Sequence, residues 1–156
     1  SGTVFFLLRS FMNNEEKRRA FELRKATQKL YAPQRITAYE RLTLFLDRIQ
    51  PSNLVLRVHK SGMSARDLQL ALNQAIRSED EHNMSQQIYV SSSSWALIKN
   101  AKEEMIKLVN IAAGQLKSSA DGMALSQRIF DMSSKAEHLP TDVALEYLKK
   151  EIRKSF

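Results

Sequence analysis

The sequence has 156 residues, which suits one domain, and 43% of them are apolar, which is enough for a sizeable core. It contains no cysteine, so disulfides, thiolate metal sites and cysteine nucleophiles are excluded. The net charge of +7 is uneven: residues 1–62 hold 12 Lys and Arg against 5 Asp and Glu, whereas residues 63–156 hold 12 of each. A neutral main body disfavours a nucleic-acid-binding domain, and the few glycines and prolines disfavour an all-β fold.

An unbroken apolar run lies near the start of the sequence, from Thr3 to Leu8, and Phe11 and Met12 extend it past Arg9. A helix that spans a bilayer needs about 20 apolar residues, so this run is too short to span one. It fits the last turns of a membrane anchor whose earlier part is missing from this sequence. It fits equally well the hydrophobic start of a helix that packs on a bundle.

A cluster of cations follows within about 20 residues of the apolar run. The cytoplasmic flanks of membrane anchors are enriched in Lys and Arg, so we expect these side chains to contact anionic lipid and the rest of the chain to lie in the cytoplasm. The same helix also carries apolar residues at packing intervals, so its distal half is expected to dock on the bundle. The candidate lipid contacts are Lys17, Arg18, Arg19, Arg24 and Lys25.

Pro33 is expected to end this first helix near Tyr31, because the residue before a proline disfavours helical dihedral angles. A second helix is predicted from about Gln34 to Ile49. Its packing stripe has apolar residues at spacings of three and four, namely Ile36, Tyr39, Leu42, Leu46 and Ile49, and is broadened by Leu44 and Phe45. Residues 54–58 favour β structure but have no partner strand. We therefore expect an extended segment there, or a further helical turn laid over the bundle.

Two helices with apolar residues at helical spacing are predicted next. The first begins at Ser64, which forms a reciprocal cap with Asp67 three residues later, while Gly62 lets the preceding chain turn. The second is a long central helix over about 94–117, capped by a run of serines, and its wide apolar stripe predicts contacts on two sides. Between them we expect a short extended connection near 86–91, because a lone strand cannot satisfy its backbone.

An acidic cluster closes the first of these helices, with Glu79, Asp80 and Glu81 followed by His82. Carboxylates and imidazole bind metals, but no second histidine lies at helical spacing, so the pattern favours a solvated helix end. The sequence also offers no set of nucleophile, base and orienting group and no glycine-rich phosphate loop. We therefore expect no catalytic residue, no metal and no cofactor.

Two shorter helices complete the prediction. One follows the break at Asp121, and the other begins at Thr141 or Asp142 and ends in a basic turn, which the helix dipole favours. The predicted fold is an all-α, irregular bundle of five to six helices. It forms a single domain over 13–156, after the stub of a membrane anchor at 1–12.

Five segments of the sequence carry a resemblance to a known family: 36–42, 53–54, 62–69, 85–90 and 148–153. They resemble a family of small uncharacterised bacterial proteins whose members begin with a hydrophobic segment, followed by a basic helix and a helical domain. The resemblance implies that residues 3–12 are the end of a membrane anchor. It implies no catalytic residue.

The leading functional interpretation is a non-enzymatic, membrane-tethered helical module that faces the cytoplasm and serves as a docking or scaffold element. Its expected partners are the membrane surface and an unknown protein or a second copy of the chain. The alternative is nucleic-acid binding through the basic N-terminal helix, which the pI of about 9.8 favours. Phe21 lies among those cations but is expected to pack inward, so they have no aromatic stacking platform, which weakens this alternative.

Overall fold

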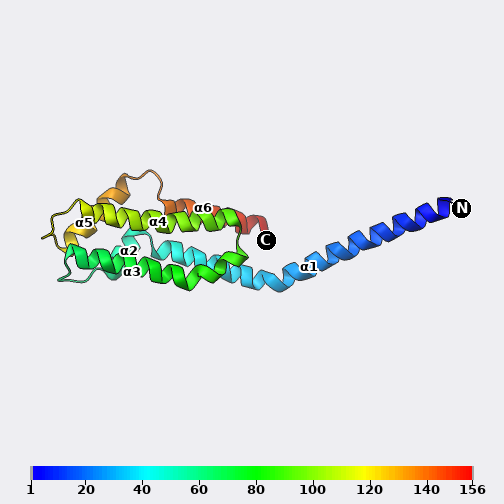
Figure 1. The fold of residues 1–156 in the computed structure, drawn as a ribbon, viewed down its shortest axis with the longest axis horizontal. Helices are drawn as coiled ribbons and strands as arrows, with labels where there is room; N and C mark the ends of the chain where they lie inside the picture. The colour runs from blue at the N-terminus through cyan, green and yellow to red at the C-terminus, as the bar shows by residue number, and fades with distance from the viewer. Residues whose placement is uncertain (1, 156) are drawn as a thin grey trace. The chain divides into compact units, whose positions relative to one another are not determined.

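The computed structural model describes residues 2–155, except for the side chains of residues 27–31. The all-α prediction is confirmed over the described residues, but the expected count of five to six helices is too low. Seven helical elements are present there, because two short stretches expected as connections form helices of their own (Figure 1). They are α1 (Gly2–Arg48), α2 (Pro51–Val58), α3 (Ala65–Asn83), the 3-10 helix η1 (Met84–Tyr89), α4 (Ser92–Gly114), α5 (Gly122–Lys135) and α6 (Pro140–Ser155).

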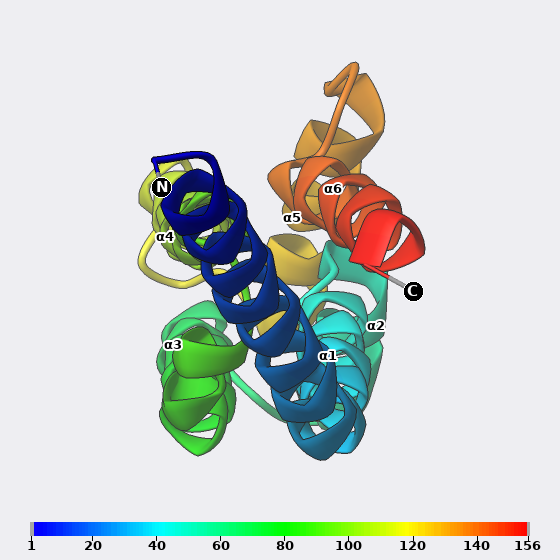
Figure 2. The same ribbon diagram turned by 90° about the vertical axis from the view of Figure 1, so that its right-hand side faces the viewer.

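The chain divides into two compact units, one that ends at Ile36 and one that begins at Thr37. In the second unit, which we call the helical domain, α3 packs on α4 and α4 packs on α6. The part of α1 from Thr37 onward contributes Tyr39, Leu42, Phe45 and Leu46 to their shared core. Both α2 and α5 pack on α3 and on each other, and Figure 2 shows α3 and α4 on the left and α2, α5 and α6 on the right. The core contains buried side chains from every α-helix of the domain, such as Phe45, Leu72 and Met105.

The central helix α4 was predicted over about 94–117 and extends from Ser92 to Gly114. Its wide apolar stripe is explained by three neighbours, because α3, α5 and α6 all pack against it. Ser91 caps its N-terminus as predicted: the Ser91 hydroxyl accepts a hydrogen bond from the Ser94 N–H at 3.1 Å.

The expected helix end near Tyr31 is wrong, because α1 continues through Pro33 to Arg48. A proline inside a helix lacks the N–H of one backbone hydrogen bond, at a cost of about 3 kcal/mol, and α1 tolerates this loss. Beyond the proline the packing prediction mostly holds, since Leu42 and Ile49 are buried. Ile36, assigned to the same stripe, is instead 40% exposed.

The connection between α3 and α4 is also different from the prediction. Residues 84–89 form the 3-10 helix η1 instead of an extended segment. A 3-10 turn satisfies its own backbone through i to i+3 hydrogen bonds, so it needs no partner strand. Residues 51–58 likewise form a helix, α2, which confirms the helical alternative; Pro51 occupies its first turn, where a missing N–H costs nothing.

The predicted cap of α3 is confirmed in both directions. The Ser64 hydroxyl accepts a hydrogen bond from the Asp67 N–H at 3.0 Å, and the Asp67 carboxylate accepts one from the Ser64 N–H at 3.3 Å. Just before it, Gly62 has a φ of 88°, a left-handed conformation that side chains disfavour. The start of α3 is therefore marked by local chemistry. Two backbone hydrogen bonds also join it to the segment before α5: the Ala65 N–H donates to the Ala120 carbonyl at 3.0 Å, and the Gly122 N–H donates to the Met63 carbonyl at 2.8 Å.

Replacing Ser64 by alanine is expected to lower the free energy of unfolding by about 1 kcal/mol, because the Asp67 N–H loses its acceptor. Urea denaturation followed by circular dichroism measures the loss. Ser61→Ala, three residues earlier in the exposed turn, is the matched control and should change the stability by less than about 0.5 kcal/mol. Equal losses in the two variants would contradict the capping role.

Candidate functional site

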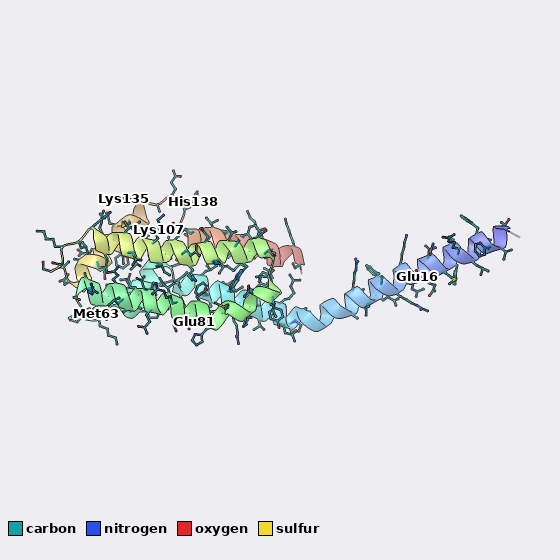
Figure 3. The ribbon with its side chains drawn as sticks, in the orientation of Figure 1. Glu16, Met63, Glu81, Lys107, Lys135 and His138 are labelled. Carbon is teal, nitrogen blue, oxygen red and sulfur yellow. The ribbon has the colours of Figure 1, made fainter. Side chains whose placement is uncertain are left out.

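The first candidate site is the apolar start of α1. Val4, Phe5, Phe6 and Leu7 are each between 57% and 70% exposed. Successive residues of an α-helix are turned by about 100°, so these four side chains point to four sides of the helix. Figure 3 shows side chains projecting both above and below this part of α1. A helix that is apolar all round is typical of one surrounded by lipid or protein.

A separate question is whether any helix of the chain could cross a membrane. Among the residues that the structure describes, no helix combines the length and the apolar character needed to cross a membrane. The apolar start of α1 was already predicted to be too short to do so.

The five predicted lipid contacts are all exposed on α1: Lys17, Arg18, Arg19, Arg24 and Lys25. We call these five residues the basic collar. Phe21, which lies among them and was expected to pack inward, is instead 67% exposed. Arg18 lies 3.4 Å from Glu22 and Arg19 lies 3.9 Å from Glu15, but ion pairs this exposed contribute little to stability. Three successive cations of the collar point to three sides of the helix, so the positive charge surrounds α1.

The second candidate site is a groove in the helical domain between the C-terminal part of α1 and α6, with a volume of about 530 Å³. We call it the α1–α6 groove. Tyr39 and Leu148 are buried beneath it, whereas Leu44 on its α1 wall is 56% exposed. An exposed leucine beside a groove of this kind offers apolar surface to a partner. The lining residues are Tyr39, Glu40, Thr43, Leu44 and Asp47 from α1, and Leu145, Leu148, Lys149 and Ile152 from α6.

Charges of opposite sign lie on the two walls of the α1–α6 groove. The α1 wall carries Glu40 and Asp47, seven residues apart and hence on the same side of the helix. The α6 wall contributes Lys149, whose ammonium group lies 3.2 Å from the Glu146 carboxylate. The exposed side of the last two turns of α6 is basic and comprises Lys149, Lys150, Arg153 and Lys154.

Near the end of α6, Glu151 joins three helices. Its carboxylate accepts hydrogen bonds from the Ser91 N–H at 3.2 Å, from the Ser94 hydroxyl and from the Tyr39 side chain. Burial by itself would raise the pKa of Glu151, but the hydrogen bonds from the two serines and Tyr39 outweigh it and lower the pKa. Glu151 therefore holds the N-terminus of α4 against α6 and α1.

Comparison with protein families identifies the group to which this sequence belongs. Residues 1–155 match a family of unknown function, DUF7935. The chain belongs to the DUF7935 family. No curated protein and no solved structure matches it.

In this DUF7935 protein two acids of the cluster at the end of α3 form ion pairs with other helices. Glu79 lies 2.6 Å from Arg48 of α1, and Asp80 lies 2.9 Å from Lys102 of α4. The solvated helix end inferred from the sequence is therefore wrong for these two acids, although Glu81 is exposed, as labelled in Figure 3. In the part of the chain that the structure describes, no three Asp, Glu or His side chains gather in a way that could hold a metal ion.

The groove and the Glu151 network of the DUF7935 chain were missed by sequence reasoning. The serines before α4 were recognised as cap residues, but the carboxylate that binds them is 60 residues further along the chain. Leu44 was expected to broaden the packing stripe of its helix, yet it is exposed at the groove. Hydrophobic periodicity marks a helix face but does not identify which neighbour covers it.

Proposed function

We propose that this protein is a non-enzymatic module tethered to the membrane through residues 3–12, with its helical domain in the cytoplasm as a docking or scaffold element. The observation that supports the tether most directly is the exposure of apolar side chains on every side of the helix between Val4 and Leu7. Lipid chains would cover all of these side chains at once. We take residues 3–12 to be the cytoplasmic end of an anchor.

The basic collar supports the same orientation. A helix that lies in the plane of a membrane surface has one apolar face and one polar face. A helix that meets the surface end-on is surrounded by headgroups, so cations on all of its sides reach anionic lipid. Each such cation contributes about 1 kcal/mol near the surface, and cytoplasmic flanks carry the excess of Lys and Arg.

The α1–α6 groove supports the docking role. It presents an exposed leucine, Leu44, between charged walls, as partner-binding surfaces commonly do. The nucleic-acid alternative is less well supported, because phosphate-binding helices gather their cations on the face that meets the backbone. The basic collar instead divides its cations among several sides of α1.

Vesicle flotation of the full chain tests the tether. The wild type is expected to float with vesicles that contain phosphatidylserine, and Lys17→Gln/Arg18→Gln should weaken this binding about thirtyfold, because two headgroup contacts of about 1 kcal/mol each are lost. Lys99→Gln/Lys117→Gln removes the same charge from exposed positions of the helical domain and is the matched control. Its binding should stay at the wild-type level.

A second variant tests the apolar contribution. Phe5→Asp/Leu7→Asp places two carboxylates in the apolar run and is expected to abolish flotation even with anionic vesicles. Flotation that survives this change, or a wild-type chain that never floats, would contradict the tether. A steep salt-dependent shift of duplex DNA by the wild type, lost in Lys17→Gln/Arg18→Gln, would support nucleic-acid binding instead.

A further inference from the structure

We propose that the α1–α6 groove binds a second copy of this chain in a two-fold symmetric dimer. The inference names the partner of the docking surface proposed above, and in that respect it rests on the proposed function. The juxtaposition that carries it is an exposed leucine on α1 beside a groove in which Glu40 lies level with the basic end of α6, so that a two-fold rotation pairs Glu40 of each copy with the basic end of the other.

The apolar part of the contact centres on Leu44. This side chain is 56% exposed, although Phe45 and Leu46 immediately after it are buried. Leu145 and Ile152 of α6 are partly buried across the groove. In a two-fold arrangement each copy can insert Leu44 into the groove of the other, which removes both leucines from water at once.

The charges select a second copy over an unrelated helix. Glu40 and Asp47 make the α1 wall acidic, whereas the exposed side of the last two turns of α6 is basic. A cationic partner helix would complement the α1 wall and be repelled by α6, and an anionic helix would have the opposite problem. The two helices are antiparallel, because Gln50 binds Asp142 and Tyr39 binds Glu151, so Glu40 is level with the basic end of α6 and Asp47 with its acidic start. A two-fold axis along the groove therefore brings Glu40 of each copy to the basic end of α6 in the other, and both of these contacts are attractive.

The size of the groove indicates a weak contact in solution. Stable protein interfaces involve about 20–30 residues on each partner, and nine residues line the groove, so the groove is a small part of an interface of that size. Tethering of both copies to one membrane raises their effective concentration, so a weak contact is sufficient there. The expected solution behaviour is a reversible, concentration-dependent equilibrium between monomer and dimer.

Sedimentation velocity of the full chain without lipid, combined with charge reversal, tests the dimer. Glu40→Lys makes both sides of the contact positive, and Lys150→Glu/Arg153→Glu makes both sides negative. Each variant alone is expected to dimerise at least about tenfold more weakly than the wild type. An equimolar mixture of the two should recover association, because both contacts of the mixed dimer pair opposite charges.

Leu44→Glu supplies the apolar test, with Leu70→Glu as its matched control. Leu70 is 58% exposed on α3 and does not line the groove, so its variant should associate like the wild type. Circular dichroism of every variant checks that the helices are retained. Leu44→Glu is expected to be monomeric at concentrations where the wild type is dimeric.

Three results would overturn the proposal. One is a wild-type chain that is monomeric at the highest concentration reached, and another is a mixture of the two charge variants that stays monomeric. The third is association that Leu44→Glu leaves intact and Phe5→Asp/Leu7→Asp removes, which would place the contact in the apolar start of α1. Because no lipid is present, failure of the dimer leaves the vesicle result standing, and failure of vesicle binding leaves the sedimentation result standing.

Discussion

Replacing Phe45 by alanine is expected to lower the free energy of unfolding by about 3–5 kcal/mol. Phe45 is 1% exposed and belongs to the core cluster of the helical domain. Truncation removes most of its buried apolar surface and leaves a cavity that close-packed neighbours fill only in part. A loss of this size is a large fraction of the stability of a typical domain.

Urea denaturation followed by circular dichroism measures this loss, and the neighbouring residue provides the control. Leu44→Ala removes a side chain that is 56% exposed, so it should cost less than about 0.5 kcal/mol. The two variants differ by one position along the same helix. Similar losses in both would contradict the assignment of Phe45 to the core face of α1 and of Leu44 to the groove.

The features that the sequence predicts well are those decided by nearby residues. The Ser64 cap needs only a side chain three residues away, and the buried side of the domain part of α1, with Leu42 and Leu46, follows from helical periodicity. The apolar run followed by the basic collar can likewise be recognised directly from the sequence. In each case the physical cause lies within two turns of helix.

Pro33 shows how a local rule fails. The preference of the preceding residue for extended angles is real, but it is small enough for a long helix to override, and α1 continues on both sides. The prediction for residues 84–89 is wrong for a related reason. Its residues favour β structure but have no partner strand, so an extended connection was expected. A 3-10 helix, which makes its own backbone hydrogen bonds, was not considered.

The contacts that position the candidate site depend on residues far apart in the chain. Arg48 donates a hydrogen bond to Glu79, 31 residues later, and the carboxylate that receives the Ser91 N–H is 60 residues further on. The sequence alone does not show whether an acidic side chain is surrounded by water or paired with a cation from another helix. The groove has the same origin, because it exists only once α1 and α6 are side by side.

Replacing Glu151 by glutamine is expected to lower the free energy of unfolding at neutral pH by about 2 kcal/mol. The amide keeps the size of the side chain but loses the charge that strengthens the hydrogen bonds from Ser91, Ser94 and Tyr39. Glu146→Gln is the matched control on the same helix. Glu146 is mostly exposed and makes a surface ion pair with Lys149, so its replacement should cost less than about 0.5 kcal/mol.

The pH dependence of this difference distinguishes an ionic role of Glu151 from a purely steric one. The pKa of Glu151 is lower in the folded chain than its ordinary value of 4.5, so its stabilising effect is fully present above about pH 4.5 and is lost as the pH falls through the folded pKa. Urea denaturation of wild type and Glu151→Gln at several pH values should therefore give a difference that is constant near neutrality and shrinks below pH 4.5. Other carboxyl groups titrate in both proteins and cancel in the comparison. A difference that stays unchanged down to the acid limit of folding would show that the shape of the side chain, and not its charge, holds α4 against α6.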